Sequence, residues 1–444
     1  MKQLDTLNTV IKDTRILGLL LVAIYAVVYD HIIKEYLFPV FGYSLNYDYH
    51  TMTSSAFAFY VAVCTLPFIF YKGFNHVASI ISLFCHVFVY IPFCHTLFVG
   101  NYSAVITTEY LMAFFMAQCA FFMTDSWKFG TKRFLSGNPI SFQSFERCVL
   151  FLLLIAVAIN AGKMRMVNIF NADDTSLLYD LRVENSSSSF AINDYLVSWL
   201  KHILLPTLMV CYLQQRNKLK LAIAFLGMIC MFMIDMQKIT FLIPFAILLF
   251  YHLYKRFPIG YLTYFHAILI IASGFFSLLV MAFANNPKVF TISAILINRT
   301  VCVEGRQLAT YLNFFEVKDN PYTYYTHINI INKLTGAYPY ADSIGRTVSY
   351  GEANSNATFF LMDGLAGGGL IGCIIIAFIF IILKSYFNSV GEYYDKSLCI
   401  IILFFSISAL MNVSLFTSLF TGGFLLFYII FKKVNLQDLR IKDC

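Results

Sequence analysis

Charged side chains are scarce in this sequence, and their scarcity excludes a water-soluble fold. Asp, Glu, Lys and Arg together make up 12% of the 444 residues, whereas soluble globular proteins average roughly 25%. Hydrophobic residues account for 59% of the chain. A surface of this composition would stay largely apolar, which is compatible with lipid but not with water.

Several chemical signatures are also absent. The sequence has no Asp-x-Asp pair, no glycine-rich nucleotide loop and no serine nucleophile elbow, which disfavours chemistry on soluble nucleotides. Of the eleven cysteines, only Cys302 lies in a long polar segment, so no disulfide framework is implied. The histidines lack the spacing of metal ligands. We therefore expect no metal and no cofactor.

Long, continuously apolar segments are what the sequence has instead. Crossing a hydrocarbon core of ~30 Å takes ~20 helical residues, and continuous rather than alternating apolar runs indicate helices. We therefore predict an all-α polytopic membrane protein with about twelve transmembrane helices. The expected spans are 16–34, 54–71, 77–98, 104–124, 147–166, 195–214, 219–235, 239–254, 261–284, 358–383, 397–413 and 416–431.

Lysine and arginine are distributed unevenly between alternate loops. With the N-terminus in the cytoplasm, most of them fall on the cytoplasmic side, and the short outer loops carry little beyond Lys34 and Lys238. The positive-inside rule predicts this asymmetry, which requires an even number of spans and both termini in the cytoplasm. The net charge of +7 follows from this topology. We therefore predict no nucleic-acid binding.

Two outer connections, 167–194 and 285–357, are much longer than the others. Loops above ~12–15 residues without internal structure are uncommon unless they are functional or disordered. The second is rich in aromatic residues, which disfavours disorder, and is long enough to hold short helices. Its tyrosines, including Tyr322-Thr-Tyr-Tyr325, suit stacking on sugar rings or an ordinary membrane interface. We treat 1–444 as one membrane domain whose working surface is these two periplasmic loops.

Four arginines, Arg182, Arg299, Arg306 and Arg346, face outward in this topology. A guanidinium group is always charged, and its planar fork matches phosphate oxygens. A cluster at the membrane surface could hold a lipid-linked diphosphate and stabilise it as a leaving group. The alternative is that these arginines pair with carboxylates of the same loops and tie the loops together. Sequence spacing does not decide between the two.

Ionisable residues also occur inside the predicted spans, at Lys201, His202 and Asp363. Such a side chain costs several kcal/mol at membrane depth unless it is paired or faces water. A polar cavity that opens outward would explain all three.

Glycine recurs at every fourth position at the start of the tenth span, at Gly364, Gly368 and Gly372. This spacing removes side chains from one helix face, so we expect a neighbouring helix backbone to pack closely there. A thin helix that leaves room for a lipid chain is the functional alternative.

An ordered set of residues between about 150 and 385 resembles the oligosaccharide repeat-unit polymerases of bacterial O-antigen and capsule pathways. The set is Tyr179-Asp-Leu-Arg182, Gln237-Lys238, Asn298-Arg299, Gly305, Tyr311, Phe314-Phe315, Ile344-Gly345, Asn354-Ser-Asn356-Ala, Phe359 and Asp363-Gly364. One position departs from the family: Glu304 stands where proline is common, which changes the turn that aims Arg306.

The resemblance implies a glycosyltransferase of the bacterial inner membrane that uses no nucleotide sugar. It would take a glycan from a polyprenyl diphosphate carrier and join it to a carrier-linked repeat unit. The resemblance assigns Arg182 and Arg299 to the diphosphate or glycan, Lys238 to the outer mouth, and Asn356 and Asp363 to the start of the tenth span. Tyr311, Arg306 and Arg346 are further candidates for substrate binding.

A base for the acceptor hydroxyl would come from Glu304, His327, Asp342 or Glu352, and the sequence does not choose among them. The expected partners are the carrier-linked donor and acceptor, membrane lipids, a chain-length regulator and a flippase. One alternative is an O-antigen ligase, which transfers the finished glycan to the lipid A core. Another is a twelve-helix transporter or flippase, against which the absence of an internal repeat argues.

Overall fold

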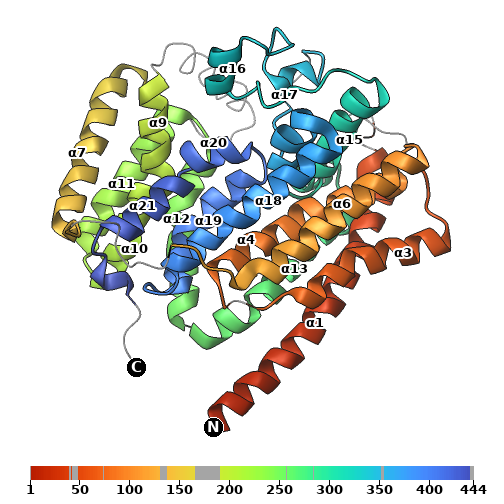
Figure 1. Ribbon diagram of the computed structural model, residues 1–444. Coiled ribbons are helices and arrows are strands. Elements are labelled where there is room, and N and C mark those ends of the chain that lie inside the picture. The colour runs from red at the N-terminus through yellow and green to blue at the C-terminus, as the bar shows by residue number, and fades with distance from the viewer. Residues whose placement is uncertain are drawn as a thin grey trace. The chain divides into compact units, whose positions relative to one another are not determined.

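The computed structural model describes residues 2–39, 42, 49–73, 75–130, 138–165, 191–256, 258–283, 285–351 and 355–440. These residues form helices joined by turns, and they contain two isolated β-bridges but no β-sheet (Figure 1). The predicted all-α class is confirmed for the part of the chain that the structure describes.

Eight helices within the described ranges are long and apolar enough to cross a membrane. They are Ile16–Leu37, Val77–Val99, Ala104–Ser126, Phe142–Lys163, Ile192–Gln215, Ile239–Arg256, Phe360–Val390 and Leu415–Lys433. Three shorter apolar helices cover Ser54–Phe70, Leu269–Ala282 and Lys396–Leu410. The molecule is an all-α membrane protein with several helices of spanning length.

The chain folds into two compact units, of which unit 1 contains Met1–Trp127, Leu262–Ser385 and Leu410–Leu415. Its helices are α1 (Lys2–Ile32), α3 (Ser54–Thr65), α4 (Val77–Cys85), α5 (Ile91–Val99), α6 (Ala104–Met123), most of α13 (Pro258–Ala282), α14 (Pro287–Ile297), α15 (Val303–Leu312), α16 (Asn329–Thr335), α17 (Ile344–Thr347) and most of α18 (Ala366–Val390).

The helix Val77–Val99, made of α4, a π-helical turn and α5, is the core of unit 1: 94% of its apolar stretch is enclosed by protein. Helix α15, from the segment 285–357, packs against α5. Gly305 permits this contact, because a Cβ atom there would lie 2.6 Å from the Thr96 hydroxyl and 3.1 Å from the Pro92 carbonyl oxygen. Part of the segment 285–357 therefore belongs to the folded core.

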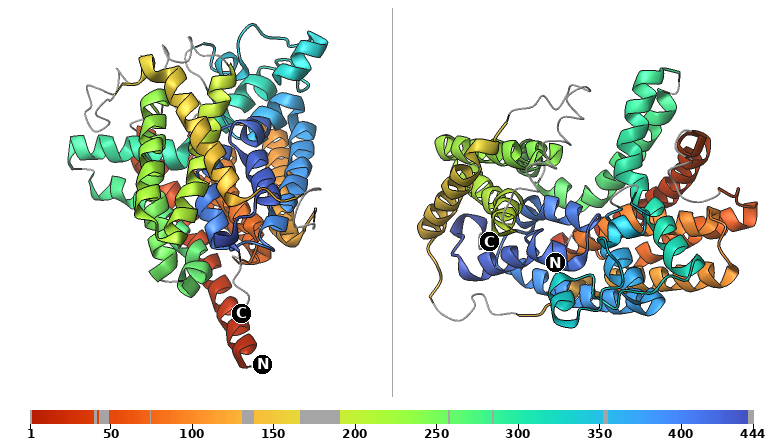
Figure 2. Two further views of the ribbon diagram at one scale, coloured as in Figure 1. Left: turned by 90° about the vertical axis from the view of Figure 1, so that its left-hand side faces the viewer. Right: turned by 90° about the horizontal axis from the view of Figure 1, so that it is seen from above.

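Unit 2 contains Lys128–Tyr261, Tyr386–Ala409 and Phe416–Cys444. Its helices are α7 (Phe142–Asn160), α9 (Ala191–Trp199), α10 (Leu205–Gln215), α11 (Lys218–Asp235), α12 (Lys238–Arg256), most of α19 (Lys396–Leu410), most of α20 (Leu415–Phe420) and α21 (Phe424–Lys433). Helices α10, α11 and α12 contact one another, and their neighbouring courses can be followed in both views of Figure 2.

Six π-helical turns interrupt the helices of the described residues. They lie at Ile33–Leu37, His86–Tyr90, Leu200–Leu204, Asn298–Cys302, Asn313–Val317 and Phe360–Leu365. Each contains at least one ionisable residue, among them Lys201, Arg299 and Asp363. Such turns are rare and occur frequently at functional sites.

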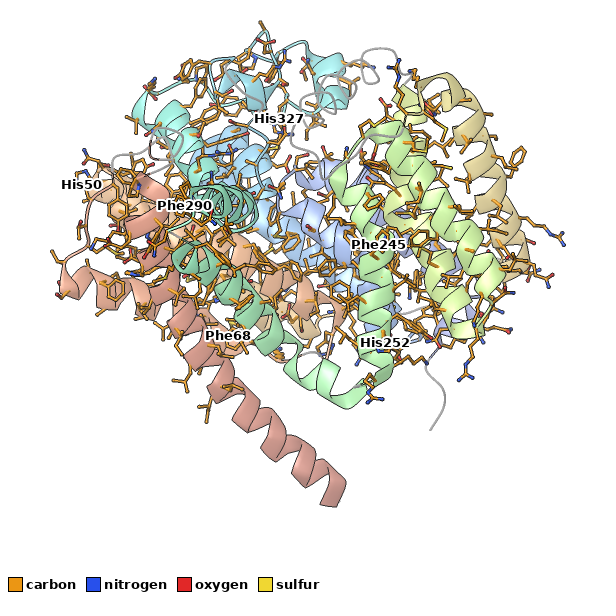
Figure 3. All side chains as sticks on the ribbon, turned by 180° about the vertical axis from the view of Figure 1, so that it is seen from behind. His50, Phe68, Phe245, His252, Phe290 and His327 are labelled. Atoms are coloured by element: carbon orange, nitrogen blue, oxygen red, sulfur yellow. The ribbon has the colours of Figure 1, made fainter. Side chains whose placement is uncertain are left out.

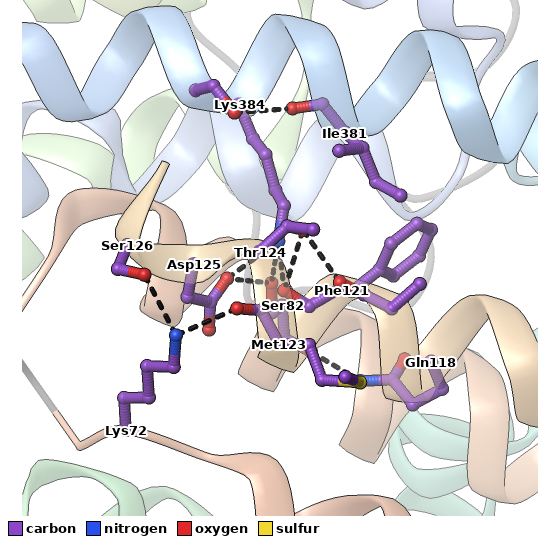
Figure 4. A network of polar contacts seen from close by, with 12 residues as sticks. Lys72, Ser82, Gln118, Phe121, Met123, Thr124, Asp125, Ser126, Ile381 and Lys384 are labelled. Atoms are coloured by element: carbon purple, nitrogen blue, oxygen red, sulfur yellow. Dashed lines mark hydrogen bonds and ion pairs between the residues drawn. The ribbon is translucent and has the colours of Figure 1, made fainter. Parts of the chain in front are cut away.

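A buried ion pair joins two of the long helices of unit 1 (Figure 4). Lys384 of α18 donates to Asp125, directly after α6, at 2.7 Å, and neither side chain is exposed. Ser82 of α4 donates to the same carboxylate oxygen at 2.7 Å, and Lys384 also contacts the Phe121 carbonyl. The pair therefore holds α4, α6 and α18 together.

We predict that Lys384→Met destabilises the protein strongly, because it leaves the Asp125 carboxylate buried and without its cation. Breaking a buried pair from one side costs about 3–5 kcal/mol. Thermal unfolding of the purified protein in detergent measures this. Lys384→Met combined with Asp125→Leu is the control and should recover most of the loss. A Lys384→Met protein as stable as the wild type would contradict this role.

Candidate functional site

A broken helix in unit 1 forms the base of the candidate site. The helix that starts with the π-helical turn Phe360–Leu365 leaves helical geometry at Gly368 and Gly369. Gly369 has φ 58° and ψ −139°, in a region that favours glycine. The break makes backbone groups available to other segments. The Ala366 carbonyl accepts hydrogen bonds from both the backbone N–H and the hydroxyl of Thr323, each at 2.8 Å.

A histidine–aspartate pair lies directly beside this break. His327 Nε2 is 3.3 Å from Asp363 Oδ1, and the other oxygen of Asp363 accepts the Leu415 backbone N–H at 2.5 Å. The second ring nitrogen, His327 Nδ1, lies 2.8 Å from the Thr323 hydroxyl. The side chain of His327 is 6% exposed and that of Asp363 is fully buried. Figure 3 labels His327, next to the start of α18.

Tyrosines fix the segment 321–328 on the broken helix. If Gly369 carried a side chain, its Cβ atom would lie 2.7 Å from the Tyr322 hydroxyl. A Cβ atom on Gly367 would lie 3.1 Å from the Tyr325 ring. Tyr322 and Tyr110 both donate to the Glu316 carboxylate, at 2.8 and 2.5 Å. Tyrosine side chains therefore pack directly against Gly367 and Gly369, and Gly364 packs against Gly372 within the broken helix.

At the glycines of the predicted spacing, a Cβ atom on Gly364 would meet the Cys373 backbone, one on Gly372 would meet the Gly364 carbonyl, and one on Gly368 would meet nothing within 4 Å. The close backbone approach therefore occurs between the two parts of the broken helix.

The backbone of this segment is strained. Tyr324 and Tyr325 have φ angles of 45° and 63°. A left-handed conformation costs a bulky residue roughly 1–2 kcal/mol, and such residues cluster at functional sites when surrounding contacts hold them. The contacts of Thr323 with Ala366 and of Tyr322 with Glu316 provide that support.

Two further predicted residues, Glu304 and Tyr311 of α15, lie on the face of α15 that meets residues 355–358. Glu304 Oε2 accepts the Thr358 N–H at 3.4 Å, and Tyr311 donates to the Ser355 carbonyl at 3.3 Å. Both are buried. Burial raises the pKa of Glu304 well above its ordinary value of 4.5, and the nearby Arg306 offsets this only in part. Burial, and then the neighbouring Asp363, also raise the pKa of Tyr311.

The structure thus brings four predicted site residues into one neighbourhood: His327, Asp363, Glu304 and Tyr311. Three others, Asp342, Arg346 and Asn356, have exposed side chains. Arg306 lies close enough to Glu304 to lower the pKa of that carboxyl, although burial raises it by more.

The remaining basic candidates are only partly described. Arg299 lies in the π-helical turn before α15, and Lys238 is the first residue of α12, but their side chains lie outside the described residues. Arg182 and Glu352 lie outside the described residues altogether.

Lys201, His202 and Asp363 do not share the one polar cavity that the sequence predicted. Each has its own local partner. In unit 2, Lys201 pairs with Asp235 at 2.6 Å and also donates to Gln237. His202 lies 3.2 Å from the Ser198 hydroxyl. Asp363 has His327 and the Leu415 N–H in unit 1. Local pairing satisfies a charge at membrane depth without a cavity.

Two residues of the site were not singled out from the sequence, Thr323 and Glu316. Thr323 stands four residues before His327, but the positive φ angles between them show that this is no helical spacing. Hydrogen bonding of Glu316 to Tyr110 joins residues that are 206 positions apart. No local sequence signal carries either contact.

No protein-family model, no curated protein and no solved structure matches this chain. Function is therefore inferred from the chemistry of the site itself.

We predict that the folding stability of the wild type falls as the pH rises, and that Glu304→Gln abolishes this fall. Because burial raises the folded-state pKa of Glu304, the folded protein holds this proton more tightly than the unfolded chain does. That contribution is complete below about pH 4.5 and is lost as the pH rises through the folded-state pKa. The wild type should therefore lose more stability than Glu304→Gln between pH 5 and 9.

Thermal midpoints across this pH range measure the difference. Glu109→Gln, at an exposed glutamate of α6, is the matched control. Parallel curves for Glu304→Gln and the wild type would show that Glu304 is ionised in the folded protein.

Proposed function

We propose that this protein polymerises oligosaccharide repeat units carried on polyprenyl diphosphate, at the outer face of the bacterial inner membrane. The reaction joins the anomeric carbon of the donor glycan to a hydroxyl of the acceptor repeat unit, and the carrier diphosphate departs. Such a reaction needs a group that accepts the hydroxyl proton and cations that stabilise the departing anion. It also needs a lipid-accessible location.

The observation that carries the proposal is the His327–Asp363 pair at the helix break. Histidine is the commonest general base, because its ordinary pKa lies near physiological pH, and a carboxylate on one ring nitrogen orients the other. Of the other candidates, Glu304 is fully buried, which raises its pKa, and Glu352 lies outside the described residues. Asp342 is exposed. We therefore assign the base to His327 and its orientation to Asp363.

Arg299 is our candidate for stabilising the diphosphate. It lies in the π-helical turn that leads directly into α15, so one continuous helical segment carries Arg299, Glu304 and Tyr311. A guanidinium group stabilises a departing diphosphate without any metal. Arg182, which the resemblance also assigns to the diphosphate or glycan, lies outside the described residues.

The proposed membrane arrangement is twelve spans with both termini in the cytoplasm, which places 285–357 in the periplasm. The eight helices of spanning length and the three shorter apolar ones correspond to eleven of these spans, and α11 covers the twelfth, 219–235. We also propose a chain-length regulator and a flippase as partners.

An O-antigen ligase acts on the same donor and remains the alternative within this chemistry. A transporter is the second candidate, and the break at Gly368 and Gly369 favours it, because transporters place discontinuous helices at their binding sites. Cells lacking a polymerase keep a single repeat unit on their core, whereas cells lacking a ligase keep polymer on the carrier. A transporter moves substrate and makes no new glycosidic bond.

We predict that purified protein in lipid vesicles converts a carrier-linked repeat unit into a ladder of longer glycans with no nucleotide sugar added. His327→Ala should slow this reaction about 10²–10⁴-fold, the usual contribution of a general base. Gel separation of the products measures both outcomes.

His252→Ala, at an exposed histidine labelled in Figure 3, is the matched control and should keep the wild-type ladder. If the wild type forms no ladder, the proposed function is wrong. A normal ladder from His327→Ala would remove His327 from the reaction.

A further inference from the structure

The hydroxyl of Thr323 has one hydrogen and two neighbours that compete for it. The Ala366 carbonyl oxygen and His327 Nδ1 both lie 2.8 Å from Thr323 Oγ1. A carbonyl can only accept a hydrogen bond, whereas an imidazole nitrogen donates or accepts according to its protonation. The direction of this one hydroxyl therefore determines which protons His327 carries.

In the first arrangement, Thr323 donates to the Ala366 carbonyl. His327 Nδ1 must then carry a hydrogen, which it donates to Thr323 Oγ1. At the other side of the ring, Nε2 faces an oxygen of Asp363. Two bare lone pairs would repel each other there, so a second proton is shared between Nε2 and the carboxyl group. We name this the loaded state.

In the second arrangement, Thr323 donates to His327 Nδ1, which is then unprotonated. The ring keeps only the hydrogen on Nε2, which points at ionised Asp363. The Ala366 carbonyl keeps the backbone N–H of Thr323 as its donor, at 2.8 Å. This state, named the released state, holds one proton fewer than the loaded state.

We propose that Thr323 sets when the His327–Asp363 pair holds or releases its second proton. The loaded state has two hydrogen bonds through the Thr323 hydroxyl, from Nδ1 and to Ala366, and the released state has one. Thr323 thus stabilises the loaded state by one additional hydrogen bond. The other oxygen of Asp363 accepts the Leu415 N–H in both states, so it does not contribute to the difference between them.

The catalytic consequence rests on the proposed function. The released state is the base. The acceptor hydroxyl gives its proton to Thr323 Oγ1 as Thr323 passes its own hydrogen to His327 Nδ1. In the same step the sugar oxygen bonds to the anomeric carbon, and the carbon–oxygen bond to the diphosphate breaks with its electron pair. The pair becomes loaded, and the diphosphate leaves as an anion. Loss of one proton from the loaded state to solvent restores the base.

Other titratable groups surround the pair. Among the described residues, Tyr311 of α15 and Tyr325 of the segment 321–328 also interact electrostatically with Asp363. Glu304 of α15 and Cys373 of α18 are the next neighbours, through Tyr311 and Tyr325 respectively. Tyrosine and cysteine side chains are ordinarily neutral near pH 7, and burial raises the pKa of Glu304, which favours its neutral form.

The test is nitrogen-15 NMR of histidine-labelled full-length protein in lipid vesicles, titrated with pH. The His327 signals are identified as those absent from His327→Gln. In the wild type, Nδ1 should lose its proton as the pH rises, while Nε2 keeps the proton that faces Asp363. A spectrum in which Nε2 is deprotonated and Nδ1 stays protonated would overturn the proposal without any variant of Thr323.

Two variants of Thr323 test the hydrogen-bond count. Thr323→Ser keeps the hydroxyl and should titrate as the wild type does. Thr323→Val is nearly isosteric and lacks the hydroxyl, so the loaded state loses one more hydrogen bond than the released state. Its midpoint should move to lower pH by about 0.5–1 unit. Equal midpoints in all three proteins would overturn the proposal.

These spectra need no substrate, so they separate two possible failures. If the expected titration is seen but no glycan ladder forms, the proposed function is wrong and the role of Thr323 stands. If the ladder forms but Nδ1 does not titrate as described, the role of Thr323 is wrong.

Discussion

A polar group held among apolar side chains must find its partner inside the protein, and this constraint shapes the site. In unit 1 a helix is interrupted at Gly368 and Gly369, and the buried carboxylate of Asp363 lies beside the break. Non-helical backbone is tolerated at such a place only when other groups satisfy it. The segment 321–328 supplies those groups, because Thr323 donates to Ala366 and His327 meets Asp363. Stability and the proposed chemistry thus depend on the same contacts.

The fold class was predictable because apolar run length is a local property. A segment of about 20 apolar residues has few alternatives to a helix, and the helices of spanning length confirm that inference. The six π-helical turns were not predictable. They depend on how one turn packs against its neighbours, which the order of residues along a single helix does not encode.

The site was predictable in part. Resemblance and residue chemistry direct attention to His327 and Asp363, but they do not pair them. The pairing joins residues 36 positions apart through a turn with two left-handed tyrosines, for which no sequence pattern exists. The ion pairs of Lys384 with Asp125 and of Lys201 with Asp235 are likewise products of tertiary packing.

The central claim is that His327 and Asp363 interact energetically as well as geometrically. A double-mutant cycle on the unfolding free energy, with His327→Gln, Asp363→Asn and the double variant in detergent micelles, measures this interaction. Residues in one hydrogen-bond network couple by about 0.5–3 kcal/mol, whereas independent sites add to within about 0.5 kcal/mol. The account predicts coupling of about 1 kcal/mol or more. Additive effects would contradict it.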